Sequence, residues 1–342
     1  MPLLCTLLLV ALQPEGKAAD SIPASGHPTL LSPHSDPIAC YGDKVFAVNT
    51  PSDTLDVLDA GTAKITARIP TGIDPVSVIV RPDGKEIWVS NHISDSVSVI
   101  DNDSQSASYL SVVATIQDID LDRKATRFDE PVGIAFADNE KAYVALSSSN
   151  RIAVVDVGSR RVVKYLRIPA QEPRAITVRN GKLYVIPFES NNQTQLSGGK
   201  AEEMDGKLVT FDAKKLAGSF DSAGFTVDVV KQPKIPDRDL FIFDTRTDEL
   251  VSTVKTLGTS LFGLAVDAAG TVFIANTDAR NHVNGRAGTK KHGLKELQNR
   301  PYLNRGTRVS ADGEAGFYHL NPLPPERPPR RNTTDGELGV IF

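Results

Sequence analysis

The sequence predicts an all-β protein, a β-propeller of four-stranded antiparallel blades. Apolar and polar residues alternate with the period of two that is typical of strands, and tight turns rich in Gly and Asp separate the runs. The pattern recurs along the chain, so that Asp59 and Asp101 close successive copies 42 residues apart. This period is that of one propeller blade, which is a four-stranded antiparallel sheet.

The repeat is clearest in three segments, 45–59, 87–101 and 142–156, each with two β-rich runs around about six polar residues and a closing Asp. A strand introduced by Asp-Pro or Glu-Pro precedes these copies, and a looser copy lies at 261–276. A helical solenoid is excluded because no part of the repeat has a period of 3.6. We therefore expect about five blades, at about 36–72, 73–116, 128–168, 171–257 and 259–320.

The connections of a propeller emerge on two faces. The first-to-second and third-to-fourth turns are short and share one face, which we call the turn face. The second-to-third connections and the links to the next blade share the other, which we call the loop face. Three insertions, 117–129, 189–236 and 278–306, fall on the loop face, and the second is expected to contain a hairpin of 207–212 with 225–230. Long loops on a rigid scaffold usually carry function.

Segment 69–101 resembles the repeat of the YVTN family of β-propellers, with Val-Ser-Asn at 89–91 in the signature position. The likeness is good to about residue 180 and weaker to 276. Segment 277–297 also resembles large secreted bacterial YVTN proteins, some of which continue into more blades and a c-type cytochrome region. These propellers, like those of the quinoprotein amine dehydrogenase type, usually have seven blades. The resemblance thus implies an incomplete seven-bladed propeller, with a closed five- or six-bladed ring as the alternative.

The ends of the chain differ from the repeat. Residues 1–19 contain the apolar run 3–12 followed by small residues, which resembles a secretory signal peptide and predicts a periplasmic or extracellular protein. Residues 321–342 form an irregular Pro/Arg-rich tail that does not match the repeat, and we interpret it as a sign that the propeller is truncated. Only 307–310 and 316–320 remain for the outer strands of the fifth blade. No apolar run reaches the roughly 18 residues of a membrane span.

Composition narrows the possible ligands. A net charge of −4 gives no reason to expect a nucleic-acid partner. Cys40 is the one cysteine after the leader and Cys-x-x-Cys-His is absent, so no haem is expected to be covalently attached to this chain. A metal ion, or a haem supplied by a partner or another region, stays possible. No nucleophile signature such as Gly-x-Ser-x-Gly occurs, and catalytic residues cannot be assigned.

The candidate ligand-binding residues are those expected on the loop face. They are His34, His92, Glu130, Arg174, Asn191, Asp278, Arg280, Asn281 and His282. If His34, His92 and His282 converge, their imidazoles could bind a metal ion, whereas the plainer interpretation is three solvated loop histidines. Arg174 replaces the Val found at the same step of two other blades and could anchor an anion.

These observations favour an exported binding scaffold. The expected partner is a protein, a cytochrome among the options, or a small anionic ligand, and the resemblance implies the propeller part of a periplasmic redox protein. Two alternatives stay open: a propeller enzyme, either a lactonase-like hydrolase or a metal-dependent oxidoreductase, and a structural cell-surface module. The fold alone does not choose among them.

Overall fold

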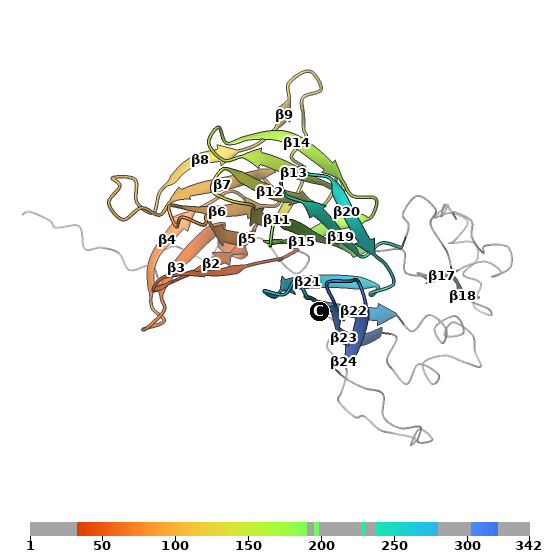
Figure 1. Cartoon of the computed structure of the whole chain (residues 1–342). Coiled ribbons are helices and arrows are strands. Elements are labelled where there is room, and N and C mark those ends of the chain that lie inside the picture. Colours follow the sequence, from red (N-terminus) through yellow and green to blue (C-terminus); the bar gives the residue numbers. More distant parts are fainter. Residues whose placement is uncertain (1–32, 190–194, 198–226, 230–236, 280–301, 321–342) are drawn as a thin grey trace, which may run out of the picture.

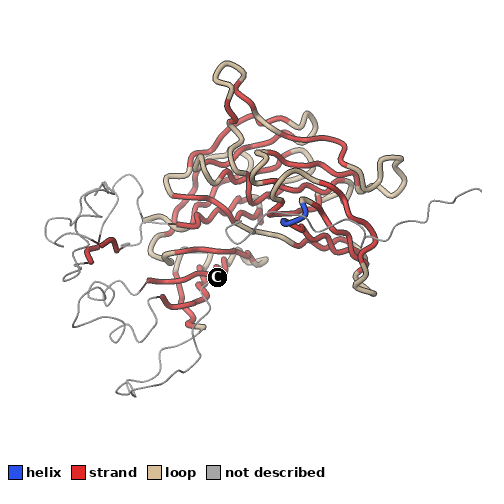
Figure 2. The backbone as a smooth tube through the Cα atoms, turned by 180° about the vertical axis from the view of Figure 1, so that it is seen from behind, coloured by secondary structure: helices blue, strands red, loops and turns tan. Residues whose placement is uncertain are grey.

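The computed structural model describes residues 33–189, 195–197, 227–229, 237–279 and 302–320. Within these ranges the chain is built from antiparallel strands, with a single short 3-10 helix at Thr50–Ser52 (Figures 1 and 2). The strands form successive four-stranded blades. The predicted fold class, a β-propeller of four-stranded antiparallel blades, is confirmed.

Five blades follow one another along the chain. Blade one contains β1 Ile38–Tyr41, β2 Lys44–Asn49, β3 Thr54–Asp59 and β4 Ile65–Pro70; blade two contains β5 Pro75–Val80, β6 Glu86–Asn91, β7 Ser96–Asp101 and β8 Val112–Ile116. Blade three contains β11 Pro131–Phe136, β12 Lys141–Leu146, β13 Arg151–Asp156 and β14 Arg161–Arg167; blade four contains β15 Gln171–Arg179, β16 Lys182–Glu189, β19 Leu240–Asp244 and β20 Leu250–Val254. Blade five contains β21 Ser260–Val266, β22 Val272–Ala279, β23 Tyr302–Val309 and β24 Ala315–His319.

Each strand pairs with the next in an antiparallel ladder, and the irregularities recur with the repeat. The first strand of blades two, three and four has a register shift just after its proline, at Pro75, Pro131 and Pro173. Blades four and five are also joined directly, because Glu189 of β16 pairs with Ser260 of β21. The recurring bulges bend the first strand of these three blades in a similar way.

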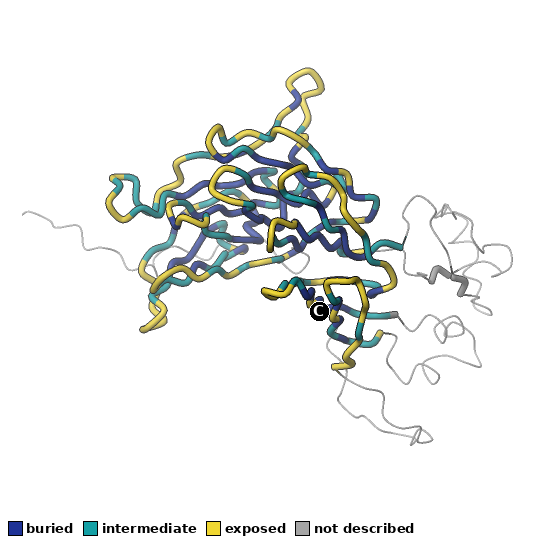
Figure 3. The backbone as a smooth tube through the Cα atoms, viewed as in Figure 1, coloured by how far each residue is buried: buried dark blue, intermediate teal, exposed yellow. Residues whose placement is uncertain are grey.

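The core lies between the blades, and one aromatic residue per blade shows how they stack. Near the start of the second strand, the five blades carry Phe46, Trp88, Tyr143, Tyr184 and Phe273. The first four are at most 3% exposed, and each packs against apolar residues of the following blade. Phe273 is 45% exposed, so its side of blade five is not covered in the same way. Figure 3 shows the buried backbone along the strands and the exposed backbone mostly in the connections.

The third strand of blade five is longer than expected. β23 pairs with β22 along eight residues, whereas 307–310 was predicted for it; β24 at Ala315–His319 agrees with the predicted 316–320 to within one residue. The full length of β23 is not evident from the sequence, because the inward side of this strand carries the polar residues Arg305 and Thr307 where apolar residues are expected. Both have partners there, since Thr307 donates to Asn276 Oδ1 at 2.7 Å and Arg305 pairs with Asp278, although the Nε of Arg305 has no hydrogen-bond partner.

Two insertions contain small hairpins. β9 Ile119–Asp120 and β10 Ala125–Thr126 form the first, which projects from the edge of the propeller in Figure 1. In the second insertion, β18 Val227–Val229 pairs with β17 Gln195–Ser197. The predicted pairing of 225–230 with 207–212 stays a prediction, because 207–212 lies outside the described residues. No helix in the described parts of the chain is long and apolar enough to span a membrane.

Candidate binding face

A repeated hydrogen bond ties the loops of the loop face together. In blades one to three, the last side chain of the second-to-third connection accepts the backbone N–H of the residue before the next blade's proline. The pairs are Asp53 with Asp74 at 2.8 Å, Asp95 with Glu130 at 2.9 Å, and Asn150 with Glu172 at 2.9 Å. All six residues have a positive φ, a conformation that needs such support in non-glycine residues. The Asp-Pro and Glu-Pro motifs of the sequence therefore mark the points where one connection is hydrogen-bonded to the next, and we call each such pair a corner.

Substitution of Asp95 tests this corner. Burial raises the pKa of Asp95, and the carboxylates of Asp129 and Glu130 add to the effect. A raised pKa favours the protonated form in the folded state, so this group's contribution to stability is greatest below the ordinary pKa of 3.8 and declines as the pH rises through the raised value.

We expect Asp95→Ala to lower the free energy of unfolding by about 1 kcal/mol, because the Glu130 N–H loses its acceptor. Asp95→Asn keeps an acceptor, as Asn150 does in blade three, and should be at least as stable as the parent at pH 7. Its advantage should disappear at low pH. Urea unfolding at pH 7 and pH 3.5 measures both differences, and an equal loss for the two variants at pH 7 would contradict the assigned bond.

Equivalent positions on this face carry different side chains. The residue that follows the aligned part of each second strand is Thr50, His92, Ser147, Phe188 or Thr277. The backbone holds two of them identically, since His92 N donates to Asp74 O and Ser147 N donates to Glu130 O. A fixed backbone with varied side chains is the arrangement expected where specificity is needed rather than stability.

Two predicted residues, His92 and Glu130, are brought together between blades two and three. His92 Nε2 lies 3.9 Å from Glu130 Oε2, and Ser147 Oγ donates to the same carboxylate oxygen at 3.2 Å. The His92 side chain is mostly buried and its Nδ1 has no hydrogen-bond partner, whereas the Glu130 side chain is 46% exposed. The cluster therefore presents a carboxylate, with a histidine and a hydroxyl behind it. Ser147 was not predicted, although alignment of the repeats places it in the slot of His92.

Arg174 belongs to a second cluster, between blades four and five. Its guanidinium pairs with Glu172 and lies 3.8 Å from the centre of the Phe188 ring, which in turn packs edge-on against Phe262. Glu189 lies within electrostatic reach of both Glu172 and Arg174. The positive charge of Arg174 is thus already matched by Glu172, and this weakens the prediction that it anchors an anion.

Two other predicted residues, His34 and Asp278, have partners outside these clusters. His34 Nε2 lies 2.7 Å from Thr50 Oγ1, whose hydroxyl donates to Pro75 O, so the imidazole acts as a donor there. Asp278 pairs with the buried Arg305 at 2.9 Å. Asn191, Arg280, Asn281 and His282 lie outside the described residues. In the described part of the chain, no three His, Cys, Asp or Glu residues are grouped to hold a metal ion. The metal site, which needs His282, stays a prediction.

The loop face also exposes a group of apolar side chains that sequence analysis missed. Ile73, Ile93, Ile119 and Leu121 are 46%, 57%, 52% and 82% exposed, and we call them the apolar patch. Ser94, next to Ile93, connects two of these segments to its own, because its hydroxyl accepts from Ile73 N and its carbonyl accepts from the side chain of Gln117, two residues before Ile119. At the turn face, the exposed large apolar side chains of the described residues, such as Tyr41 at 44% and Val113 at 38%, lie in strands and not in the connections. The connections of the two faces therefore differ in what they offer to a partner.

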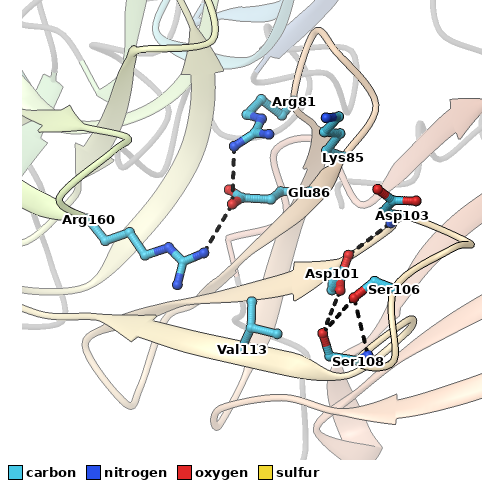
Figure 4. A pocket seen from close by; sticks show the side chains of 9 residues that line it. All are labelled: Arg81, Lys85, Glu86, Asp101, Asp103, Ser106, Ser108, Val113 and Arg160. Atoms are coloured by element: carbon cyan, nitrogen blue, oxygen red, sulfur yellow. Dashed lines mark hydrogen bonds and ion pairs between the residues drawn. The ribbon is translucent and has the colours of Figure 1, made fainter.

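The turn face carries a polar pocket of about 330 Å³ between blades two and three (Figure 4). At its centre, Glu86 pairs with Arg81 and Arg160, each at 3.1 Å, and accepts from the indole N–H of Trp88. One carboxylate thus satisfies donors from both blades. Because its charge is fully engaged, we interpret this pocket as a link between blades rather than a ligand site.

Comparison with known proteins supports the fold but gives no closer relationship. No model of a known protein family matches the chain, and no curated protein matches its sequence. The structure is similar to that of hydrazine synthase from Kuenenia stuttgartiensis, with a TM-score of 0.58 and 19% identity over 84% of this chain. This chain spans only 66% of that one. The WD40 β-propeller domain of Doa1 and the structure of U3-55K match less well, with TM-scores of 0.45 and 0.46 and 10% identity. They cover 69% of this chain and 58% and 57% of their own lengths. The likeness to hydrazine synthase is one of fold, and with the blades it establishes that the chain is a β-propeller.

Proposed function

We propose that this β-propeller is a binding scaffold that holds a protein partner on its loop face. The observation that carries the proposal is the apolar patch, in which Ile73 and Ile93 lie one and two residues from Asp74 and Asp95, two residues held by the repeated hydrogen bonds. Exposed apolar side chains with a polar surround mark protein interaction sites. Glu130 lies in the connection from blade two to blade three. Its carboxylate, with His92 and Ser147 behind it, would supply directional polar contacts.

Site-specific photo-cross-linking in the native host tests the proposal. Benzoylphenylalanine at Ile93 should yield a discrete cross-linked protein. The matched control is Val113 of the same blade, which is 38% exposed and lines the turn-face pocket. Benzoylphenylalanine at Val113 should yield no such product. A product from position 113 alone, or from neither position, would sink the proposal.

The finer assignment rests on the sequence resemblance. We infer that the chain belongs to the YVTN-repeat propellers, is exported to the periplasm and serves a redox protein in which a c-type cytochrome is the partner. Segment 69–101 and the leader at 1–19 support this inference. Cell fractionation of the native protein tests the export, because a chain confined to the cytoplasm contradicts it. The cross-linked product tests the partner, which should carry a covalent haem that is visible by its peroxidase activity.

A further inference from the structure

Two arginines face each other across neighbouring strands of blade three. Arg151 begins β13 and Arg167 ends β14, and the antiparallel register makes them direct partners. Side chains at directly opposed positions lie on the same side of the sheet with their Cβ atoms about 5 Å apart. Like charges in this arrangement destabilise the sheet unless something neutralises them.

No carboxylate of the described residues forms an ion pair with either arginine of this pair. The Arg151 guanidinium lies 4.6 Å from the centre of the Tyr165 ring, which occupies the same side of β14 as Arg167. The hydroxyl of Tyr165 in turn donates to Asp118 Oδ2 at 2.5 Å, so the carboxylate of Asp118 lies behind the tyrosine ring and keeps its charge there. Neither arginine forms an ion pair within the described ranges. Among the described residues, neither guanidinium therefore has a direct ion-pair partner.

A pocket of about 400 Å³ lies at this pair, on the outer margin of the loop face. Its lining consists of Ser149, Asn150, Arg151, Tyr165, Arg167, Ile168, Pro169 and Ala170. Ser149 Oγ is buried and has no hydrogen-bond partner. Asn150 already uses its Oδ1 to accept the Glu172 N–H. The pocket thus offers two guanidinium groups and a free hydroxyl, and it contains no acidic side chain.

We propose that this pocket binds a doubly charged oxyanion, with a phosphate group as the ligand chemistry. Guanidinium groups form paired hydrogen bonds with phosphate oxygens, and two of them match its charge of about −2. The Ser149 hydroxyl supplies a further donor. The volume lies in the range of small-molecule sites, which favours a phosphomonoester over a bare phosphate ion. These observations are separate from the apolar patch, so this proposal stands or fails independently of the scaffold function.

Binding is tested with inorganic phosphate and glycerol 3-phosphate, in buffers matched in ionic strength with sodium chloride. At 20 mM, either anion should raise the melting temperature of the parent chain by about 3 °C, because ligands that bind the folded state stabilise it. Arg167→Gln should abolish this shift. The same variant should melt no lower than the parent in phosphate-free buffer, since the repulsion between the arginines is gone. If Arg167 only stabilised the fold, its substitution would lower the melting temperature in phosphate-free buffer as well.

Arg161→Gln is the matched control, because Arg161 is exposed at the other end of the same strand and does not line the pocket. It should keep the full phosphate response. Calorimetric titration then distinguishes the sources: tighter binding of glycerol 3-phosphate identifies a phosphomonoester site, and equal binding identifies a site for the free anion. The proposal is overturned if Arg167→Gln keeps the phosphate shift, or if chloride alone produces the same shift in the parent.

Discussion

Trp88→Ala should lower the free energy of unfolding by about 3–5 kcal/mol, the range for removing a large aromatic side chain from a core. Trp88 is fully buried, and its ring centre lies 4.9 Å from that of Phe136 in an edge-on contact with blade three. Its indole N–H also donates to Glu86 at 2.9 Å, so the substitution removes a hydrogen bond that lies beside two ion pairs. Chemical denaturation followed by circular dichroism measures the loss.

Phe273→Ala is the matched control, because Phe273 occupies the position of Trp88 in blade five. Its side chain is 45% exposed, and we expect a loss of no more than about 1 kcal/mol. The difference between the two variants measures how much the following blade contributes to the core. Similar losses for Trp88→Ala and Phe273→Ala would show that a further surface covers blade five, and would contradict the described stacking.

Gly133→Ala should have the second large effect, a loss of about 3 kcal/mol. A Cβ on Gly133 would lie 2.3 Å from the backbone oxygen of Arg174 and 3.3 Å from Ile176, both in the first strand of blade four. Backbone atoms on both sides are held in sheets, so neither can move aside cheaply. The glycine therefore permits the innermost strands of blades three and four to approach each other closely.

The equivalent glycine of blade five is Gly263, where an added Cβ would meet no atom within 4 Å. Gly263→Ala should be neutral or stabilising by about 0.5 kcal/mol, since alanine reduces the entropy of the unfolded chain. The two variants carry the same chemical change at the same step of the repeat. A loss of similar size in both would mean that strand propensity, and not contact between blades, decides the cost.

Much of the fold could be predicted because the repeat encodes it locally. The alternation of each strand, the aromatic position represented by Trp88, and the short turns recur in every blade, so that errors in one copy are corrected by the others. The fold class and the four-stranded architecture follow from this pattern. The full length of β23 in blade five was not predicted, because Arg305 and Thr307 interrupt the expected alternation of apolar residues. In the structure, Arg305 bonds to Asp278 and Thr307 bonds to Asn276.

The candidate site was less predictable because it arises from contacts between blades. His92 and Glu130 were both expected on the loop face, but only the structure shows that their side chains lie 3.9 Å apart with Ser147 beside them. To predict that Arg151 and Arg167 face each other, the exact register of β13 and β14 must be known. A bulge between these two strands shifts that register by one residue. Hydrophobic periodicity does not specify such a shift.

The central claim is that the loop face, and not the turn face, holds a partner. The most direct measurement is the affinity of the protein captured at position 93, determined by calorimetry for the parent chain, for Ile73→Asp/Ile93→Asp and for the control Val113→Asp. We predict at least a tenfold loss, about 1.4 kcal/mol or more, for the double variant, because each buried apolar contact would be replaced by a carboxylate. The control should bind as the parent does. Unchanged binding of Ile73→Asp/Ile93→Asp, together with weakened binding of Val113→Asp, would contradict the assignment of the binding surface to the loop face.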